Sequence, residues 1–162
     1  MTTSSSRRQW LAPLADQERE LAAKRAALHD KVRVILADGV RYELRADDGS
    51  SPRGFSLKAS RDAVELWATS LPAASMGDGM PFAAGGGSVV VAGLDLRSRR
   101  RLRLIGIDAA TGAIRYVRRH PSTSDGATEV ALSGDVAFVA WAQELRGYEA
   151  ATGKLLWRTG AD

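Results

Sequence analysis

The residues of this chain that could bind a charged partner are a run of arginines near its middle. Within residues 97–104, Arg99, Arg101 and Arg103 would share one face of a strand, and Arg97 lies two positions before them. Such a strip is a candidate site for nucleic acid or another anionic surface. The alternative is a solvated strand face on which arginine replaces lysine, and the lack of interleaved aromatic residues for base stacking favours this alternative.

Catalytic chemistry has few candidate residues in this sequence. The histidines His29 and His120 are isolated, and neither has a second histidine or a glutamate at metal-ligand spacing. The run 85–88 lacks the lysine of a phosphate-binding loop, and Trp141, which could stack on a planar ligand, is more typical of a sheet core. Cysteine is absent, which excludes disulfides, thiolate metal sites and cysteine nucleophiles. We therefore predict no catalytic, cofactor-binding or metal-ligating residue.

A repeat, rather than a reactive group, organises the chain. Residues 105–116 (Ile-Gly-Ile-Asp-Ala-Ala-Thr-Gly-Ala-Ile-Arg-Tyr) return as residues 146–157 (Arg-Gly-Tyr-Glu-Ala-Ala-Thr-Gly-Lys-Leu-Leu-Trp). Each copy predicts a strand, a short turn and a second strand. Asp108 or Glu149 ends the first strand, where an acidic side chain can accept hydrogen bonds from the N–H groups of the turn. Self-similarity of this kind indicates a repeat architecture.

The turn glycines and the aromatic residues that follow them are the other recurring parts. Gly112 and Gly153 close the turns, where we expect positive φ angles that only glycine adopts without strain. On each outgoing strand, an apolar residue and an aromatic residue two positions later are predicted to share one face. These pairs are Ile114 with Tyr116 and Leu155 with Trp157.

The first part of the chain differs in composition from the rest. Residues 1–9 are rich in serine and threonine and are predicted to be disordered. Residues 10–29 are rich in helix formers and predict an N-terminal helix, with Leu14, Leu21 and Leu28 recurring every seven residues. This helix is expected either to lie on its own sheet or to dock as a partner helix into another subunit.

After residue 30 the sequence predicts an all-β chain of antiparallel repeats, in units of about 30–72, 84–120 and 127–162. Residues 32–44 predict a tight hairpin around Asp38-Gly39. Trp67 takes a role in the first unit like that of Tyr116 and Trp157 in the later ones. Residues 88–93 form an apolar run typical of a strand at a buried position in a sheet.

Together these features resemble the pyrroloquinoline-quinone-type (PQQ-type) β-propeller repeat. The resemblance rests on the turn glycines Gly112 and Gly153 and on the aromatic residues Tyr116 and Trp157. It implies that the aromatic residue of one blade packs near the turn glycine of its neighbour. It covers residues 85–162 well and residues 30–70 weakly, because Asp62-Ala63 stands there in place of Thr-Gly.

The resemblance also implies what a quinone-dependent enzyme of this fold would need. Such enzymes hold their cofactor with an acidic residue, a calcium site, a stacking tryptophan and often a vicinal disulfide. The sequence has no cysteine and no acidic cluster at calcium-ligand spacing. This departure from the family pattern favours a role without a cofactor and leans against an enzyme.

A propeller ring closes with about four to eight blades, whereas residues 30–162 supply at most three. We therefore expect additional blades or protein subunits to cover the open edges. The predicted function is a non-catalytic protein-binding or scaffold module, part of a larger protein or assembly. Two alternatives stay open: an N-terminal fragment of a quinone-dependent oxidoreductase with its catalytic residues beyond Asp162, and an anion- or nucleic-acid-binding module using the arginine strip.

The location of the protein is predicted from its N-terminus. Arg7-Arg8 resembles a twin-arginine export motif, but acidic residues follow in place of an apolar region. We therefore predict a cytoplasmic protein, and no stretch of the sequence is long and apolar enough to span a membrane.

Overall fold

The computed structural model describes residues 17–20, 32–46, 54–71, 80–94, 101–121, 129–141 and 144–160. The chain divides into two units, Met1–Lys31 and Val32–Asp162. In the first unit, residues 17–20 are helical, which falls inside the predicted helix 10–29. Leu14, Leu21 and Leu28, and the segment 1–9 predicted to be disordered, lie outside the described residues. In the described part of the chain, no helix has the length and hydrophobicity that crossing a membrane requires.

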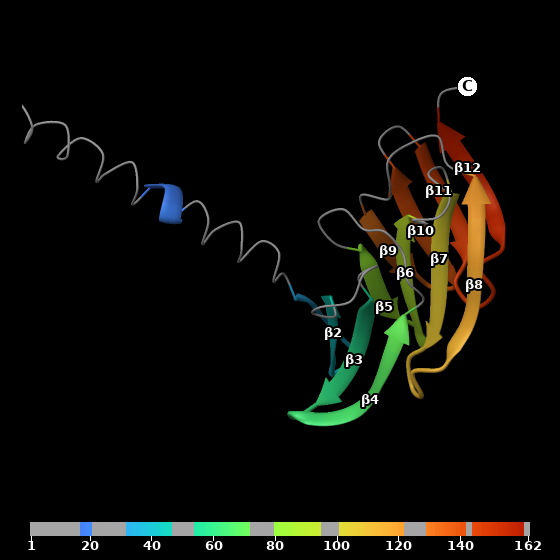
Figure 1. Cartoon of the computed structure of the whole chain (residues 1–162). Helices are drawn as coiled ribbons and strands as arrows, with labels where there is room; N and C mark the ends of the chain where they lie inside the picture. Colours follow the sequence, from blue (N-terminus) through green and yellow to red (C-terminus); the bar gives the residue numbers. More distant parts are fainter. Residues whose placement is uncertain are drawn as a thin grey trace, which may run out of the picture. The chain divides into compact units, whose positions relative to one another are not determined.

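The second unit consists of three antiparallel sheets of four strands each, as far as its described residues show (Figure 1). In every sheet, strands that follow one another in the sequence pair with one another. Sheet 1 comprises β1 (Arg33–Ala37), β2 (Val40–Ala46), β3 (Phe55–Arg61) and β4 (Val64–Leu71). Sheet 2 comprises β5 (Phe82–Gly85), β6 (Ser88–Leu94), β7 (Arg101–Asp108) and β8 (Ile114–Pro121). Sheet 3 comprises β9 (Glu129–Ser133), β10 (Val136–Trp141), β11 (Glu144–Glu149) and β12 (Leu155–Gly160). The all-β prediction is confirmed.

Two-residue turns close both outer hairpins of sheet 1. Asp38 and Gly39, between β1 and β2, have φ angles of 52° and 73°. Asp62 and Ala63, between β3 and β4, have φ angles of 50° and 64°. Two successive positive φ angles match the twist of paired strands. Asp62-Ala63, which departs from the repeat pattern, therefore forms a shorter turn. This turn lacks the glycine found in the corresponding turns of the other two sheets.

The core consists of two apolar clusters, one on each face of sheet 2. On β6, Val89 and Val91 pack in the cluster shared with sheet 1, whereas Val90 and Ala92 pack in the cluster shared with sheet 3. All four side chains are fully buried. Alternate residues of a strand point to opposite faces, so a strand covered on both sides needs an uninterrupted apolar run. This requirement explains the sequence of residues 89–92.

A β-bulge interrupts the pairing of the third and fourth strands in every sheet, just before the aromatic residue. In sheet 2, Ile107 pairs with Ile114 and Gly106 pairs with Tyr116. Because Ile107 and Gly106 are adjacent, their partners lie on opposite faces. Ile114 is 39% exposed, while Tyr116 is buried. The prediction that the apolar and aromatic residues of each pair share a face is wrong, because the sequence pattern did not reveal the bulge.

Candidate functional site

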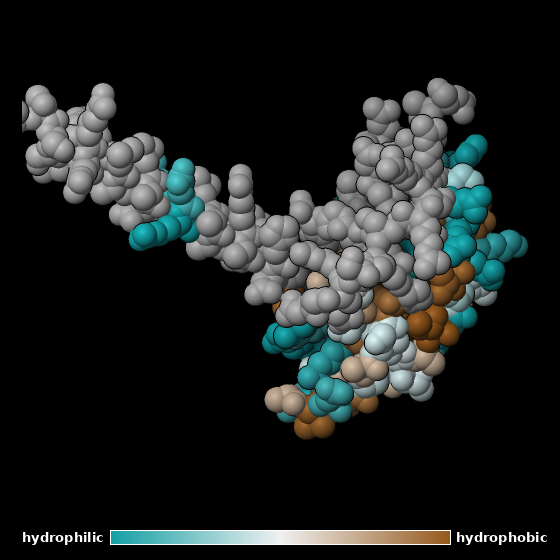
Figure 2. Space-filling view, viewed as in Figure 1, coloured by the Kyte–Doolittle hydropathy of each residue, from teal (hydrophilic) through white to brown (hydrophobic). Residues whose placement is uncertain are grey.

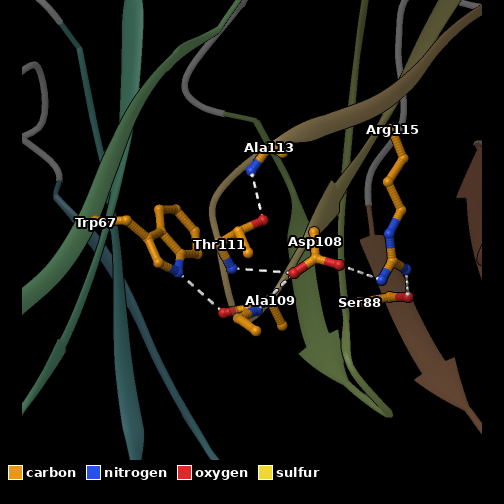
Figure 3. A network of polar contacts seen from close by, with 8 residues as sticks. Trp67, Ser88, Asp108, Ala109, Thr111, Ala113 and Arg115 are labelled. Atoms are coloured by element: carbon orange, nitrogen blue, oxygen red, sulfur yellow. Dashed lines mark hydrogen bonds and ion pairs between the residues drawn. The ribbon is translucent and has the colours of Figure 1, made fainter.

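The turn between β7 and β8 is held by Asp108 (Figure 3). One carboxylate oxygen of Asp108 accepts hydrogen bonds from the backbone N–H groups of Ala110 (2.9 Å) and Thr111 (3.0 Å). The other accepts from the guanidinium of Arg115, which also donates to the Ser88 hydroxyl at 3.1 Å. The Arg115 bond first, and then the turn N–H groups, hold the pKa of Asp108 below its usual value. Asp108 thus caps its own turn, as the sequence indicated.

The turn between β11 and β12 has the same backbone and a different side-chain contact. The Gly153 N–H donates to the Glu149 carbonyl at 2.8 Å, as Gly112 donates to Asp108 at 2.8 Å. The longer Glu149 side chain accepts from the hydroxyl of Thr152. Gly112 and Gly153 have φ angles of 74° and 70°. The expected positive φ angles of the two turn glycines are confirmed.

Trp67 of sheet 1 packs on the Gly112 turn of sheet 2 (Figure 3). Its indole N–H donates to the carbonyl of Ala109 at 2.9 Å, and the hydroxyl of Thr69 donates to the carbonyl of Gly112 at 2.6 Å. A Cβ atom at Gly112 would lie 2.6 Å from the Trp67 ring, which no side chain could tolerate without displacement. Because Gly112 has no side chain, the Trp67 indole can pack directly on the turn.

Tyr116 of sheet 2 packs in the same way on the Gly153 turn of sheet 3. Its hydroxyl donates to the carbonyl of Ala150 at 3.0 Å, and the Arg118 side chain donates to the carbonyl of Thr152 at 3.0 Å. A Cβ atom at Gly153 would lie 2.4 Å from the Tyr116 ring. Burial raises the pKa of Tyr116 to about 12, which keeps the phenol protonated and able to donate.

Among the described residues, Trp157 of sheet 3 packs on its own sheet and has no glycine turn of another sheet against its ring. Its ring lies over Gly147, where a Cβ atom would be 2.4 Å away, and its centroid is 5.7 Å from that of Phe138. Trp157 is 37% exposed, whereas Trp67 and Tyr116 are 8% and 7% exposed. The three aromatic residues are thus equivalent in position and differ in whether a following sheet covers them.

Among the solved structures that are similar to this chain is an enzyme with a similar fold. The europium-containing methanol dehydrogenase matches with a TM-score of 0.54 and 15% sequence identity, over 80% of this chain and 24% of that chain. No protein-family model matches the sequence, and a comparison with curated proteins finds no similar one. The sheets are PQQ-like propeller blades. At this identity the likeness shows the fold alone, and the chain spans about a quarter of the length of that enzyme.

The arginine strip is divided between different environments in these blades. Arg101 is exposed on β7, whereas Arg103 on the same strand is only 6% exposed. Arg97 and Arg99, as well as the side chain of Trp141, lie outside the described residues. The burial of Arg103 removes it from any continuous charged surface, so anion binding by the strip stays a hypothesis that rests on the other three arginines.

A buried polar cluster between sheets 2 and 3 was missed by the sequence reasoning. The ring of His120 lies 4.8 Å from that of Tyr148, and burial, followed by the charge of Arg146, lowers the pKa of His120. Arg146 donates to the carbonyl of Pro121 at 2.8 Å and to the carboxylate of Glu144 at 2.8 Å. The cluster joins the end of β8 to β11. Arg146 and Tyr148 stand two positions apart on one strand and therefore share a face. This spacing is the sequence signal that could have revealed the cluster.

Among the described residues, no three histidine, aspartate or glutamate side chains gather into a group that could hold a metal ion. The carboxylates of Asp108, Glu149 and Glu144 instead accept hydrogen bonds within the blades. The chemistry available at the recurring residues is therefore that of hydrogen-bonded packing between sheets.

Proposed function

We propose that the chain is a non-catalytic protein-binding or scaffold module built from PQQ-like blades, acting within a larger protein or assembly. The observation that carries the proposal is the apolar surface of sheet 3. Leu145 (37% exposed) and Trp157 (37%) share the face of sheet 3 away from sheet 2, and Leu156 (47%) precedes Trp157 at the bulge, whereas Leu155 pairs with the buried Tyr148 on the other face. Clustered apolar side chains on a folded surface mark interaction sites. Figure 2 shows exposed hydrophobic side chains, in brown, among hydrophilic ones on the visible face of the sheets.

The use of the repeat residues supports a structural role. The acidic residues hold turns, the glycines receive rings, and the aromatic residues join one blade to the next. These groups act in folding and in the packing of one sheet on the next. A binding experiment tests this role.

The test is capture of a partner by the tagged full chain in an extract of its own cells. We expect one stoichiometric partner, retained by the wild type and by Leu36→Glu and lost by Leu156→Glu. Leu36 is the matched control, because it is 76% exposed on sheet 1 and lies away from the proposed surface. Equal retention by both variants, or no stoichiometric partner for the wild type, would contradict the proposal.

The alternative of a quinone-dependent oxidoreductase fragment is favoured by one observation, the likeness to a methanol dehydrogenase. It is tested by titrating the full chain with pyrroloquinoline quinone and Ca²⁺ while following the quinone absorbance. Saturable uptake at one molecule per chain would support the alternative and remove the non-catalytic proposal. We expect no uptake, because the carboxylates at the turns of sheets 2 and 3 are engaged within the blades.

A further inference from the structure

We propose that the outer edge of β8 binds an acidic peptide segment as an added antiparallel strand, in which two adjacent acidic residues face Arg118 and Arg119. The outer edge is the side of β8 away from β7. This surface is separate from the apolar surface of sheet 3, so the inference goes beyond the proposed function.

The outer edge of β8 offers a row of backbone hydrogen-bonding groups. Within the part of the chain that the structure describes, β8 is the last strand of sheet 2 and pairs only with β7 (Figure 1). Alternate residues of such an end strand turn their N–H and C=O groups away from the sheet. Because β8 has eight residues, an added strand of ordinary length, about five or six residues, can pair along it.

The exposed side chains of β8 are basic and apolar. Its arginines are Arg115, Arg118 and Arg119, and the strand has no acidic residue. Ile114 is 39% exposed and Val117 is 40% exposed. Of the corresponding strands in the other two sheets, β4 has one glutamate and no arginine, and β12 has one arginine. The edge of β8 therefore differs from the other two edges in its positive charge.

The acidic side chain of the hairpin that β7 and β8 form is engaged within the hairpin. Asp108 at the end of β7 is paired with Arg115. The two strands together have five arginines, and Asp108 is their one acidic residue. An acidic segment is therefore attracted to this edge, whereas a basic segment is repelled.

Arg118 is held in position by the neighbouring sheet. Its Nε–H donates to the carbonyl of Thr152 at 3.0 Å, and its side chain lies against Gly153, where a Cβ atom would be 2.8 Å from the Arg118 Cγ atom. Among the described residues, the two terminal nitrogens of Arg118 have no ion-pair partner. A guanidinium with a fixed position and available terminal N–H groups can bind a carboxylate through two parallel hydrogen bonds.

The register of β8 specifies the order of side chains in the added strand. Val117 pairs with Ile105 and Arg119 pairs with Arg103, so both lie on the face of β8 opposite to Arg118. An antiparallel strand beside β8 meets positions 119, 118 and 117 in this order from its own N-terminus. Opposite charges and apolar pairs are favourable across neighbouring strands. The matching sequence is therefore acidic, acidic, apolar.

The experiment titrates the ¹⁵N-labelled full chain with the peptide acetyl-Thr-Glu-Glu-Val-Thr-Thr-Val-amide. We expect saturable binding, with amide exchange slowed by about ten-fold or more at those β8 residues whose N–H groups point away from β7, because a newly hydrogen-bonded N–H exchanges only when the pairing opens. Exchange in β1–β4 should stay unchanged. Arg119→Glu should weaken binding by about five-fold or more, because like charges face each other across the strands. The matched control is Arg33→Glu, the same change of charge at an exposed position of β1, which should bind as the wild type does.

Two further peptides separate strand pairing from attraction between charges. They have the same sequence and carry N-methyl groups on alternate backbone nitrogens, in the two possible alternations. The peptide whose methyl groups face β8 cannot donate to the edge and should not bind. Equal affinity of all three peptides, equal affinity of the wild type and Arg119→Glu, or no saturable binding of the first peptide would each overturn the inference. Leu156→Glu should bind the peptide as the wild type does, so these outcomes leave the proposed function of sheet 3 to its own test.

Discussion

At the scale of single residues, the contacts between sheets depend on the missing side chains of Gly112 and Gly153. We expect Gly112→Ala to lower the free energy of unfolding by about 2–5 kcal/mol. The left-handed backbone costs an alanine roughly 1–2 kcal/mol, and the Cβ atom 2.6 Å from the Trp67 ring adds an overpacking cost of about 1–3 kcal/mol. Urea denaturation of the full chain measures the loss.

Gly39→Ala is the matched control for this substitution. Gly39 has a φ of 73°, close to the 74° of Gly112, but a Cβ atom there would meet nothing within 4 Å. The free energy of unfolding should fall by about 1–2 kcal/mol in this variant, from backbone strain alone. Equal losses of the free energy of unfolding in the two variants would mean that the contact between Trp67 and Gly112 contributes nothing to stability.

His120 gives the fold a dependence on mildly acidic pH. Because burial lowers its pKa in the folded state, the unfolded chain binds the proton first as the pH falls through about 6.5. Stability is therefore complete above about pH 7 and is lost as the pH falls toward the depressed pKa of His120. The depressed pKa values of Glu43 and Glu144 act only in a lower range.

The test compares the free energy of unfolding at about pH 7.5 and pH 5.5. The wild type and His29→Gln should lose stability between the two, and His120→Gln should lose much less. An unchanged pH dependence in His120→Gln would show that the histidine next to Tyr148 is not the titrating group.

At the scale of elements, each interface between neighbouring sheets has its own aromatic residue. Tyr116→Ala should cost about 3 kcal/mol and raise hydrogen exchange mainly in β9–β12, because it frees sheet 3 from sheet 2. Trp67→Ala should raise exchange mainly in β1–β4 for the same reason. Trp157→Ala, at an aromatic residue without a covering sheet, should leave both interfaces protected. Uniform loss of protection in all three variants would contradict a stack of separately docked sheets.

The sequence predicted the local parts of these elements and missed what depends on neighbours. The turns at Gly112 and Gly153 are held by residues no more than seven positions apart in the sequence, so their spacing alone indicated them. The bulge before Tyr116 depends on the register between two strands. The sequence around Gly106 does not predict that register. The burial of Arg103 likewise depends on which face another sheet covers, whereas alternation specifies only that two faces exist.

At the scale of the whole molecule, the outer faces of sheets 1 and 3 differ in a way that the repeat pattern conceals. Sheet 1 has the ion pairs of Glu43 and Lys58 on its outer face, beside the exposed Val34 and Leu36, whereas sheet 3 has Phe138 and Trp157. Ion pairs on a surface are compatible with solvent, and an exposed aromatic pair favours a partner. The two outer faces therefore differ in chemistry: ion pairs stand on sheet 1 and an aromatic pair stands on sheet 3.

This difference between the outer faces of sheets 1 and 3 predicts the mass of the chain alone in solution. Light scattering after gel filtration should show no closed oligomer of fixed size, because a copy has no free glycine turn to cover Trp157 and sheet 1 presents charge instead. The mass in dilute solution should stay near the 17.3 kDa of one chain, and Trp157→Ala should leave it unchanged. A discrete ring that Trp157→Ala dissolves would mean that copies complete one another, with sheet 1 of one chain covering sheet 3 of the next despite its ion pairs. That result would make a second copy of the chain the partner of the apolar surface of sheet 3.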